Sequence, residues 1–145
     1  MVSSSAGREA ANAPELTFGE AKKIVQRVED LFGKADLPNI IRGFTTDAVA
    51  RFADFPELRG REAIGKFLAA RFARQRDYRL KKHLRMVMGD MIGNEWHADW
   101  TDGKTGKKMR GRGMEFWTMR DGKIAVWDAT FNVWEDGGPP GTPVV

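Results

Sequence analysis

The sequence predicts an α+β fold in which three helices pack on one mostly antiparallel sheet. Apolar residues recur at helical spacing through much of the first half of the chain, and from Tyr78 onward they alternate with a period of two. Three turn signals divide this second half into four runs of about ten residues each, as in an antiparallel meander. The 145 residues fit a single domain.

The helices are predicted from their ends and from their apolar stripes. Thr17 and Glu20 have the spacing of a capping box at the start of the first helix, and Gly33 is a typical stop. A second, short helix is predicted from Pro38, because the first turn of a helix tolerates proline. A third helix is predicted over 60–76, where the apolar positions are Ile64, Phe67, Leu68 and Phe72.

The strands are predicted from alternation and from turns. A short strand is expected over 48–55, and turns at 89–90, 102–106 and 121–122 separate the four long runs. The last run sorts its side chains onto two faces. One face holds Ala125, Trp127, Ala129, Phe131 and Val133, and the other holds Ile124, Val126, Asp128, Thr130 and Asn132.

The two ends of the chain are expected to lack regular structure. Residues 1–16 are rich in serine and alanine, and residues 135–145 are rich in glycine and proline. The folded domain is therefore predicted over 17–134. The N-terminal stretch has no apolar signal-peptide core, and no apolar run has the length of a membrane span. A cytoplasmic location without membrane contact is expected.

The amino-acid composition limits the kinds of functional site that the chain can form. The chain has no cysteine and only two histidines, His83 and His97, so we expect no metal site. Half of the 24 lysine and arginine residues lie in 71–85 and 104–112. Phe72, an aromatic residue of the first segment, belongs to the apolar stripe of the predicted third helix. The second segment contains a predicted hairpin turn. A solvated basic face is favoured over nucleic-acid binding.

Two pieces of the sequence carry a family resemblance. The segment FTTDAVARFADFPELRGREAIGKFL and the segment RDGKIAVWDATFN, in this order of elements, resemble the nuclear transport factor 2-like superfamily. This superfamily includes SnoaL-like cyclases, ketosteroid isomerases and limonene epoxide hydrolases. The stretches RDYRLKK, NEWHADW and RGMEFW resemble most closely a bacterial branch of SnoaL-like proteins. Fold alone does not assign an activity, because this fold hosts many.

The resemblance implies a cone in which a curved sheet wraps its concave face around the helices. It also implies an internal pocket for a small molecule and a homodimer formed through the convex face. Trp127 and Trp96 are expected to face inward, with Asp99 and Asp128 outside. The residues expected to bind the small molecule are Phe52, Trp96, Trp100, Met114, Phe116, Trp127 and Phe131, and such a lining favours a flat apolar or aromatic ligand.

The catalytic residues of the known relatives have no counterparts at the matched positions. The two acids of ketosteroid isomerases fall on Phe52 and Met114, neither of which transfers protons. The Asp-Arg-Asp group of limonene epoxide hydrolases falls on Trp96, Ala98 and Ala129. A slip of one residue would exchange the faces of a strand, so an acid displaced by register is the open alternative.

Asp54 is the candidate catalytic residue that the sequence offers. On an unbroken strand it shares the face of Phe52, near the pocket mouth, where desolvation would suit a general base. The alternative is a solvated turn acid. Glu115, His97 and Asp128 are expected to meet on the convex face as a polar network at the dimer interface.

Three functions remain open from the sequence. The first is a SnoaL-like isomerase, cyclase or hydrolase that needs no cofactor and acts on a small apolar or aromatic metabolite. The second is a non-catalytic small-molecule binding module or dimeric accessory protein, which the missing carboxylates favour. The third, nucleic-acid binding, ranks last.

Overall fold

The computed structural model describes residues 15–144 and has the predicted α+β architecture. Within these residues the helices are α2 (Phe18–Gly33), α3 (Leu37–Arg42) and α4 (Gly60–Arg74). The strands are β1 (Phe44–Phe52), β2 (Leu58–Arg59), β3 (Gln75–Met88), β4 (Met91–Asp102), β5 (Lys108–Arg120) and β6 (Lys123–Glu135). Most of the predicted N-terminal tail, residues 1–14, lies outside the described residues.

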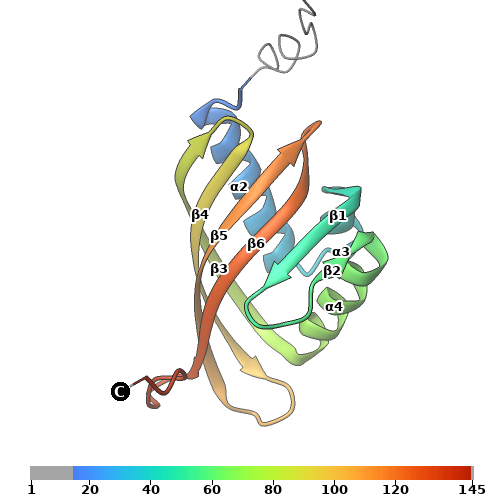
Figure 1. Cartoon of the computed structure of the whole chain (residues 1–145). Coiled ribbons are helices and arrows are strands. Elements are labelled where there is room, and N and C mark those ends of the chain that lie inside the picture. The colour runs from blue at the N-terminus through green and yellow to red at the C-terminus, as the bar shows by residue number, and fades with distance from the viewer. Residues whose placement is uncertain (1–14, 145) are drawn as a thin grey trace, which may run out of the picture.

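The six strands form one mixed sheet in the order β2-β1-β6-β5-β4-β3. β1 and β6 are parallel, and the other neighbours are antiparallel. The long strands β3 to β6 bend together around α2, while α3 and α4 lie beside β1 (Figure 1). The concave face of this curved sheet therefore meets the helices, and the convex face is left without a helix, as the predicted cone requires.

The helix signals in the sequence were accurate. The Thr17 hydroxyl accepts from the Glu20 N–H at 3.1 Å, and the Glu20 carboxylate accepts from the Thr17 N–H at 3.0 Å, which confirms the capping box. The boundaries differ by a few residues elsewhere. β1 begins earlier than predicted and ends at Phe52, because Ala53 adopts a positive φ of 47° that breaks the strand.

The two faces of the sheet follow the predicted alternation on β4 and β6. Trp96, Trp100 and Trp127 are buried on the concave face. Asp99 and Asp128 point outward, where they form ion pairs with Arg79 and Arg51. The predicted alternation fails at the start of β6, because the β5–β6 register shifts between Thr118 and Met119. Ile124, which was expected on the outer face, is therefore buried in the core.

Candidate functional site

A group of polar side chains lies buried on the concave face, and we call it the inner polar cluster. It consists of Lys82 from β3, Asn94 from β4, Glu115 and Trp117 from β5, and Trp127 from β6. Lys82 and Glu115 form an ion pair whose side chains are only 3% and 2% exposed. The Trp127 indole N–H donates to the second Glu115 oxygen at 2.9 Å. An acid and a base thus face each other inside the cone.

Glu115 lies in the interior because of the register of β5. The inward residues of this strand are Met109, Gly111, Gly113, Glu115, Trp117 and Met119, and the residues between them are exposed or partly exposed. Met114 and Phe116 point outward and are 50% and 46% exposed. The expectation that these two line the interior is therefore wrong. That expectation assumed regular pairing of the two strands back from the turn at 121–122. The β5–β6 register shifts between Thr118 and Met119, and a shift of one residue exchanges the two faces of a strand.

Burial and aromatic neighbours control the charge of Lys82. Desolvation lowers the pKa of the Lys82 amine, and the carboxylate of Glu115 opposes that shift. The Nζ atom lies 5.2 Å from the ring centroid of Trp127 and 5.3 Å from that of Trp117, which is the range of cation–π attraction. Burial therefore opposes the charge on Lys82, while its carboxylate partner favours that charge.

Two further polar groups of the cluster have no partner among residues 15–144. Both amide atoms of Asn94 and the indole N–H of Trp117 are buried without a hydrogen bond to protein. Asn94 is the direct Cα partner of Glu115 across the β4–β5 ladder, so the two side chains are neighbours on one face. A buried polar group without a partner costs about 1–3 kcal/mol. The cluster can therefore donate to, and accept from, a polar group that enters it.

An apolar cavity of about 550 Å³ opens between α4 and the ends of β4, β5 and β6, and we call it the mouth cavity. Its lining is mostly apolar and includes the side chains of two residues predicted to bind a ligand, Trp100 and Phe131. The remaining lining residues are Phe55, Phe67, Ala70, Arg71, Arg74, Gln75, Asp102, Lys104, Met109 and Val133.

Arg71 lines the mouth cavity, and its charge acts on Lys82 of the inner polar cluster. Its guanidinium carbon lies 5.9 Å from each of the ring centroids of Tyr78, Trp96 and Phe131. The charge of Arg71 and that of Glu115 both act on the pKa of Tyr78, which burial raises. A charge that lines the cavity and a charge of the cluster therefore act on the same side chain, although Glu115 itself does not line the cavity.

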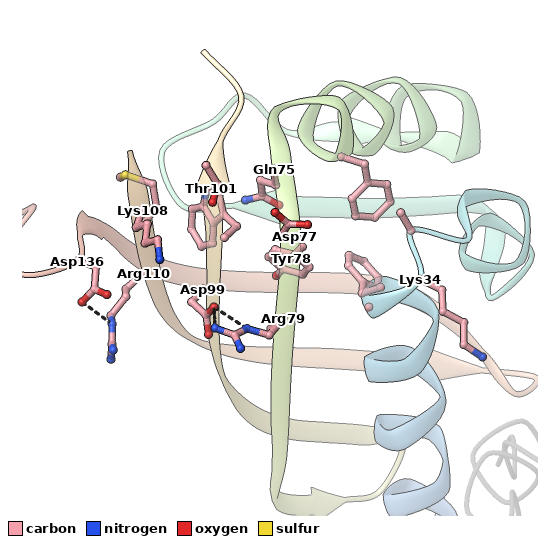
Figure 2. Close-up of a pocket in the computed structure, with 16 residues that line it drawn as sticks. Lys34, Gln75, Asp77, Tyr78, Arg79, Asp99, Thr101, Lys108, Arg110 and Asp136 are labelled. Atoms are coloured by element: carbon pink, nitrogen blue, oxygen red, sulfur yellow. Dashed lines mark hydrogen bonds and ion pairs between the residues drawn. The ribbon is translucent and has the colours of Figure 1, made fainter. Parts of the chain in front are cut away.

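A second, larger cavity of about 780 Å³ lies on the other side of Gln75, Trp100 and Met109, next to the end of α2. Figure 2 shows its polar rim, where Arg79 pairs with Asp99 and Arg110 pairs with Asp136. These ion pairs are exposed, and Lys34, Asp77 and Lys108 add further charged groups to the same rim. This cavity is the weaker candidate for an apolar ligand, because its rim is largely charged.

The other predicted site residues are distributed between core and surface. Phe52, Trp96 and Trp127 are buried; the Phe52 ring centroid lies 5.8 Å from that of Trp127. Asp54 is exposed in the turn after β1 and lines none of the cavities described above. The geometric premise for Asp54, an unbroken strand, is wrong because the strand ends at Phe52.

The polar network predicted on the convex face is also wrong in part. His97 and Asp128 do point outward, but Glu115 lies on the opposite face of the sheet. Within residues 15–144, no group of three or more histidine, aspartate or glutamate side chains is placed to hold a metal ion. No helix in the same range is long and apolar enough to cross a membrane.

Sequence reasoning missed Lys82, Asn94 and Arg71 as site residues and placed Glu115 on the wrong face. Two signals in the sequence pointed to the positions of Glu115 and Arg71. In RGRGMEFW, Gly111 and Gly113 share one face of β5 with Glu115. A Cβ atom on Gly113 would lie 2.5 Å from the Trp96 indole nitrogen, so the glycines mark the face that meets the tryptophans. Arg71 lies on the apolar stripe of its helix, one turn beyond Phe67 and Leu68.

Comparisons with known proteins agree with this architecture. The model of the SnoaL-like domain family matches residues 25–127. A comparison with curated proteins finds no match to the sequence.

Solved structures with a similar fold include an epoxide hydrolase from M. tuberculosis that resembles limonene epoxide hydrolase. It has 16% identity, a TM-score of 0.62 and coverage of 79% of this chain and 84% of that one. The epoxide hydrolase/cyclase-like enzyme SalBIII of salinomycin formation has 17% identity, a TM-score of 0.70 and coverage of 80% and 97%. An NTF2-like protein from Burkholderia pseudomallei has 15% identity, a TM-score of 0.69 and coverage of 77% and 90%. At these identities the likeness establishes the fold.

Proposed function

Because the chain belongs to the SnoaL-like domain family, we propose that it binds a small apolar or aromatic metabolite in the mouth cavity. The observation that carries this proposal is the cavity itself. Its volume of about 550 Å³ lies in the range of small-molecule sites, roughly 300–1,000 Å³. Aromatic side chains make up much of its wall, and flat rings pack well against such walls.

The chemistry proposed for this site is proton transfer without a cofactor, as in an isomerase, cyclase or hydrolase. Glu115 replaces Asp54 as the proposed acid–base group, because it is a buried carboxylate of the concave face and has a basic neighbour in Lys82. Asn94 and Trp117 supply polar atoms without protein partners beside it. For a substrate to reach Glu115 from the mouth cavity, Arg71 and the rings around it must move aside.

A non-catalytic binding module is the second candidate, and one observation favours it. Both oxygens of Glu115 are already engaged, one by Lys82 and one by Trp127. Incubation with an epoxide probe, styrene oxide, and with a β,γ-unsaturated ketone separates the two candidates. A turnover that Glu115→Gln abolishes supports the enzyme. Binding of the probes without turnover supports the module.

Ligand binding in the mouth cavity is tested by a substitution that fills part of the cavity with a large side chain. Ala69 and Ala70 are both exposed, but only Ala70 lines the mouth cavity. We expect Ala70→Trp to abolish binding of 2-naphthamide, measured by calorimetry, and Ala69→Trp to leave it unchanged. Equal binding by both variants would show that the ligand does not occupy this cavity.

The convex face supports a homodimer as the assembly of this protein. Met114 and Phe116 are exposed on it. A Cβ atom on Gly93 would lie 2.6 Å from Met86 Cγ and 3.1 Å from Phe116 Cε1, so Met86 and Phe116 cover Gly93 as one apolar patch. Exposed apolar patches of this kind are typical of interfaces.

A further inference from the structure

We propose that Arg71 binds an acidic group of the ligand, so that the mouth cavity takes apolar or aromatic carboxylates in preference to neutral molecules. This inference rests on the proposed function and specifies its substrate class. It makes Arg71 a specificity-determining residue at the boundary between the mouth cavity and the inner polar cluster.

The hydrogen-bonding capacity of Arg71 is largely unused among residues 15–144. Its Nε atom donates to the Gln75 side-chain oxygen at 3.1 Å, and one Nη atom has a long contact of 3.5 Å with the Tyr78 hydroxyl. No carboxylate oxygen within this range lies close enough to form an ion pair with it. A guanidinium has five N–H donors arranged to hold a carboxylate by two parallel bonds. The remaining donors suit a ligand carboxylate.

The surrounding charges favour an anion in the same place. Three cations and one carboxylate line the mouth cavity: Arg71, Arg74, Lys104 and Asp102. The Asp102 carboxylate already accepts from Arg74 at 2.6 and 3.1 Å and from the Thr105 hydroxyl at 2.8 Å. The next acid inward, Glu115, is paired with Lys82. The uncompensated positive charge of the cavity is therefore concentrated at Arg71 and Lys104.

The aromatic rings around Arg71 indicate the chemical character of the rest of the ligand. Tyr78, Trp96 and Phe131 restrict the guanidinium and exclude water from part of it. A charged hydrogen bond gains strength where water is excluded. The cavity wall beyond Arg71 is apolar, with Phe67, Trp100 and Val133 among its residues. The complementary ligand has one acidic head and one apolar, preferably flat, body.

The experiment compares two probes that share a shape and differ in charge, 2-naphthoate and 2-naphthamide, by calorimetry. We expect the wild-type protein to bind 2-naphthoate at least about tenfold more tightly, as a charged hydrogen bond to Arg71 implies. Added salt should reduce this preference. Arg71→Gln should remove the preference while 2-naphthamide still binds, and Arg71→Lys should keep part of it. The matched control is Arg76→Gln, because Arg76 is exposed and does not line the cavity.

The outcomes separate this inference from the proposed function. If wild type binds both probes equally, the inference is wrong and the binding proposal stands. If neither probe binds, the proposed function fails. If near-ultraviolet circular dichroism shows that Arg71→Gln does not fold, the preference of the wild-type protein for 2-naphthoate and the effect of salt on that preference still test the inference. An unchanged preference in a folded Arg71→Gln protein assigns Arg71 a purely structural role.

Discussion

Glu115 and Lys82 are buried charges in the centre of an otherwise aromatic interior. An apolar pair of similar volume would often be as stable, since the desolvation of two ions offsets much of their attraction. Stability alone therefore does not explain why ionisable residues occupy these positions. The proton transfer proposed above, or the binding of a polar group beside Asn94, would account for them.

The energetic coupling of this pair can be measured by a double-mutant cycle. We expect Glu115→Gln and Lys82→Met each to lower the free energy of unfolding by about 3–5 kcal/mol, because each leaves a buried charge without its counter-ion. The double variant should lose much less than the sum. Urea unfolding followed by tryptophan fluorescence provides the values.

The exposed pair Glu62–Lys66 on α4 is the matched control. Its variants should leave the unfolding midpoint unchanged within error, because solvent screens exposed pairs. Additive effects for Glu115 and Lys82 would contradict the geometry described above.

Among the elements, β4 and β5 depend on each other through complementary shapes. The indoles of Trp96 and Trp100 lie over Gly111 and Gly113 of the neighbouring strand, and a Cβ atom on Gly111 would lie 3.0–3.1 Å from both rings. Glycine is required here by close approach, not by backbone angle. The same contact orients Trp96 against Arg71 at the boundary of the mouth cavity.

A single methyl group tests this arrangement. Gly113→Ala would place its Cβ atom 2.5 Å from the Trp96 indole nitrogen and 2.8 Å from the Thr130 carbonyl oxygen, so the indole or the backbone must move. We expect a loss of about 1–3 kcal/mol in the free energy of unfolding. Gly33→Ala is the control, because nothing lies within 4 Å of the added atom there. A neutral Gly113→Ala would mean that Trp96 has another rotamer available.

The junction between α4 and β4 is sensitive to acid. Hydrogen bonds from Arg74 and Thr105 hold the pKa of the Asp102 carboxyl well below its ordinary value of 3.8. Since the pKa is lowered on folding, Asp102 stabilises the protein above about pH 4, and this contribution is lost as the pH falls below that value. We expect Asp102→Asn to be less stable than wild type at neutral pH and to lose less stability between pH 5 and 3. Urea midpoints across that range test it, and parallel curves for the two proteins would refute it.

The sequence predicted most of the fold and little of the site, and the residues show why. The capping box at Thr17 and the alternation around Trp96 and Trp127 are local signals, and they were correct. Glu115 was assigned to the wrong face because the shift between Thr118 and Met119 depends on pairing with β6. The pairing of Lys82 with Glu115 joins residues 33 positions apart. No local pattern reports such a contact, so the site emerged only from the sheet register.

At the scale of the whole molecule, the two faces of the sheet have different partners. The concave face is filled by helices and aromatic side chains, whereas the convex face exposes Met86, Met114 and Phe116. The cation-rich segments 71–85 and 104–112 are partly neutralised by acidic side chains. Acidic partners pair with many of their members, including Lys81, Arg85 and Lys107.

The proposed homodimer is tested on this convex face. We expect Phe116→Glu to convert the protein from dimer to monomer in light scattering coupled to size exclusion, because a buried unpaired charge opposes association. Phe18→Glu is the control, since Phe18 is 58% exposed at the start of α2, away from this face. A wild-type protein that is monomeric at every concentration would exclude the dimer.

The hydrogen bond from the Lys82 backbone N–H to the Glu29 carboxylate, 2.8 Å long, has a consequence for solubility. β3 is the last strand of its sheet and has fourteen residues. An outermost strand of that length is a template on which another chain can add its own strand. Because α2 packs against β3 and occupies one of its outward N–H groups with an acidic side chain, an incoming strand meets a helix and a negative charge. The addition of another strand is therefore opposed at this part of the β3 edge.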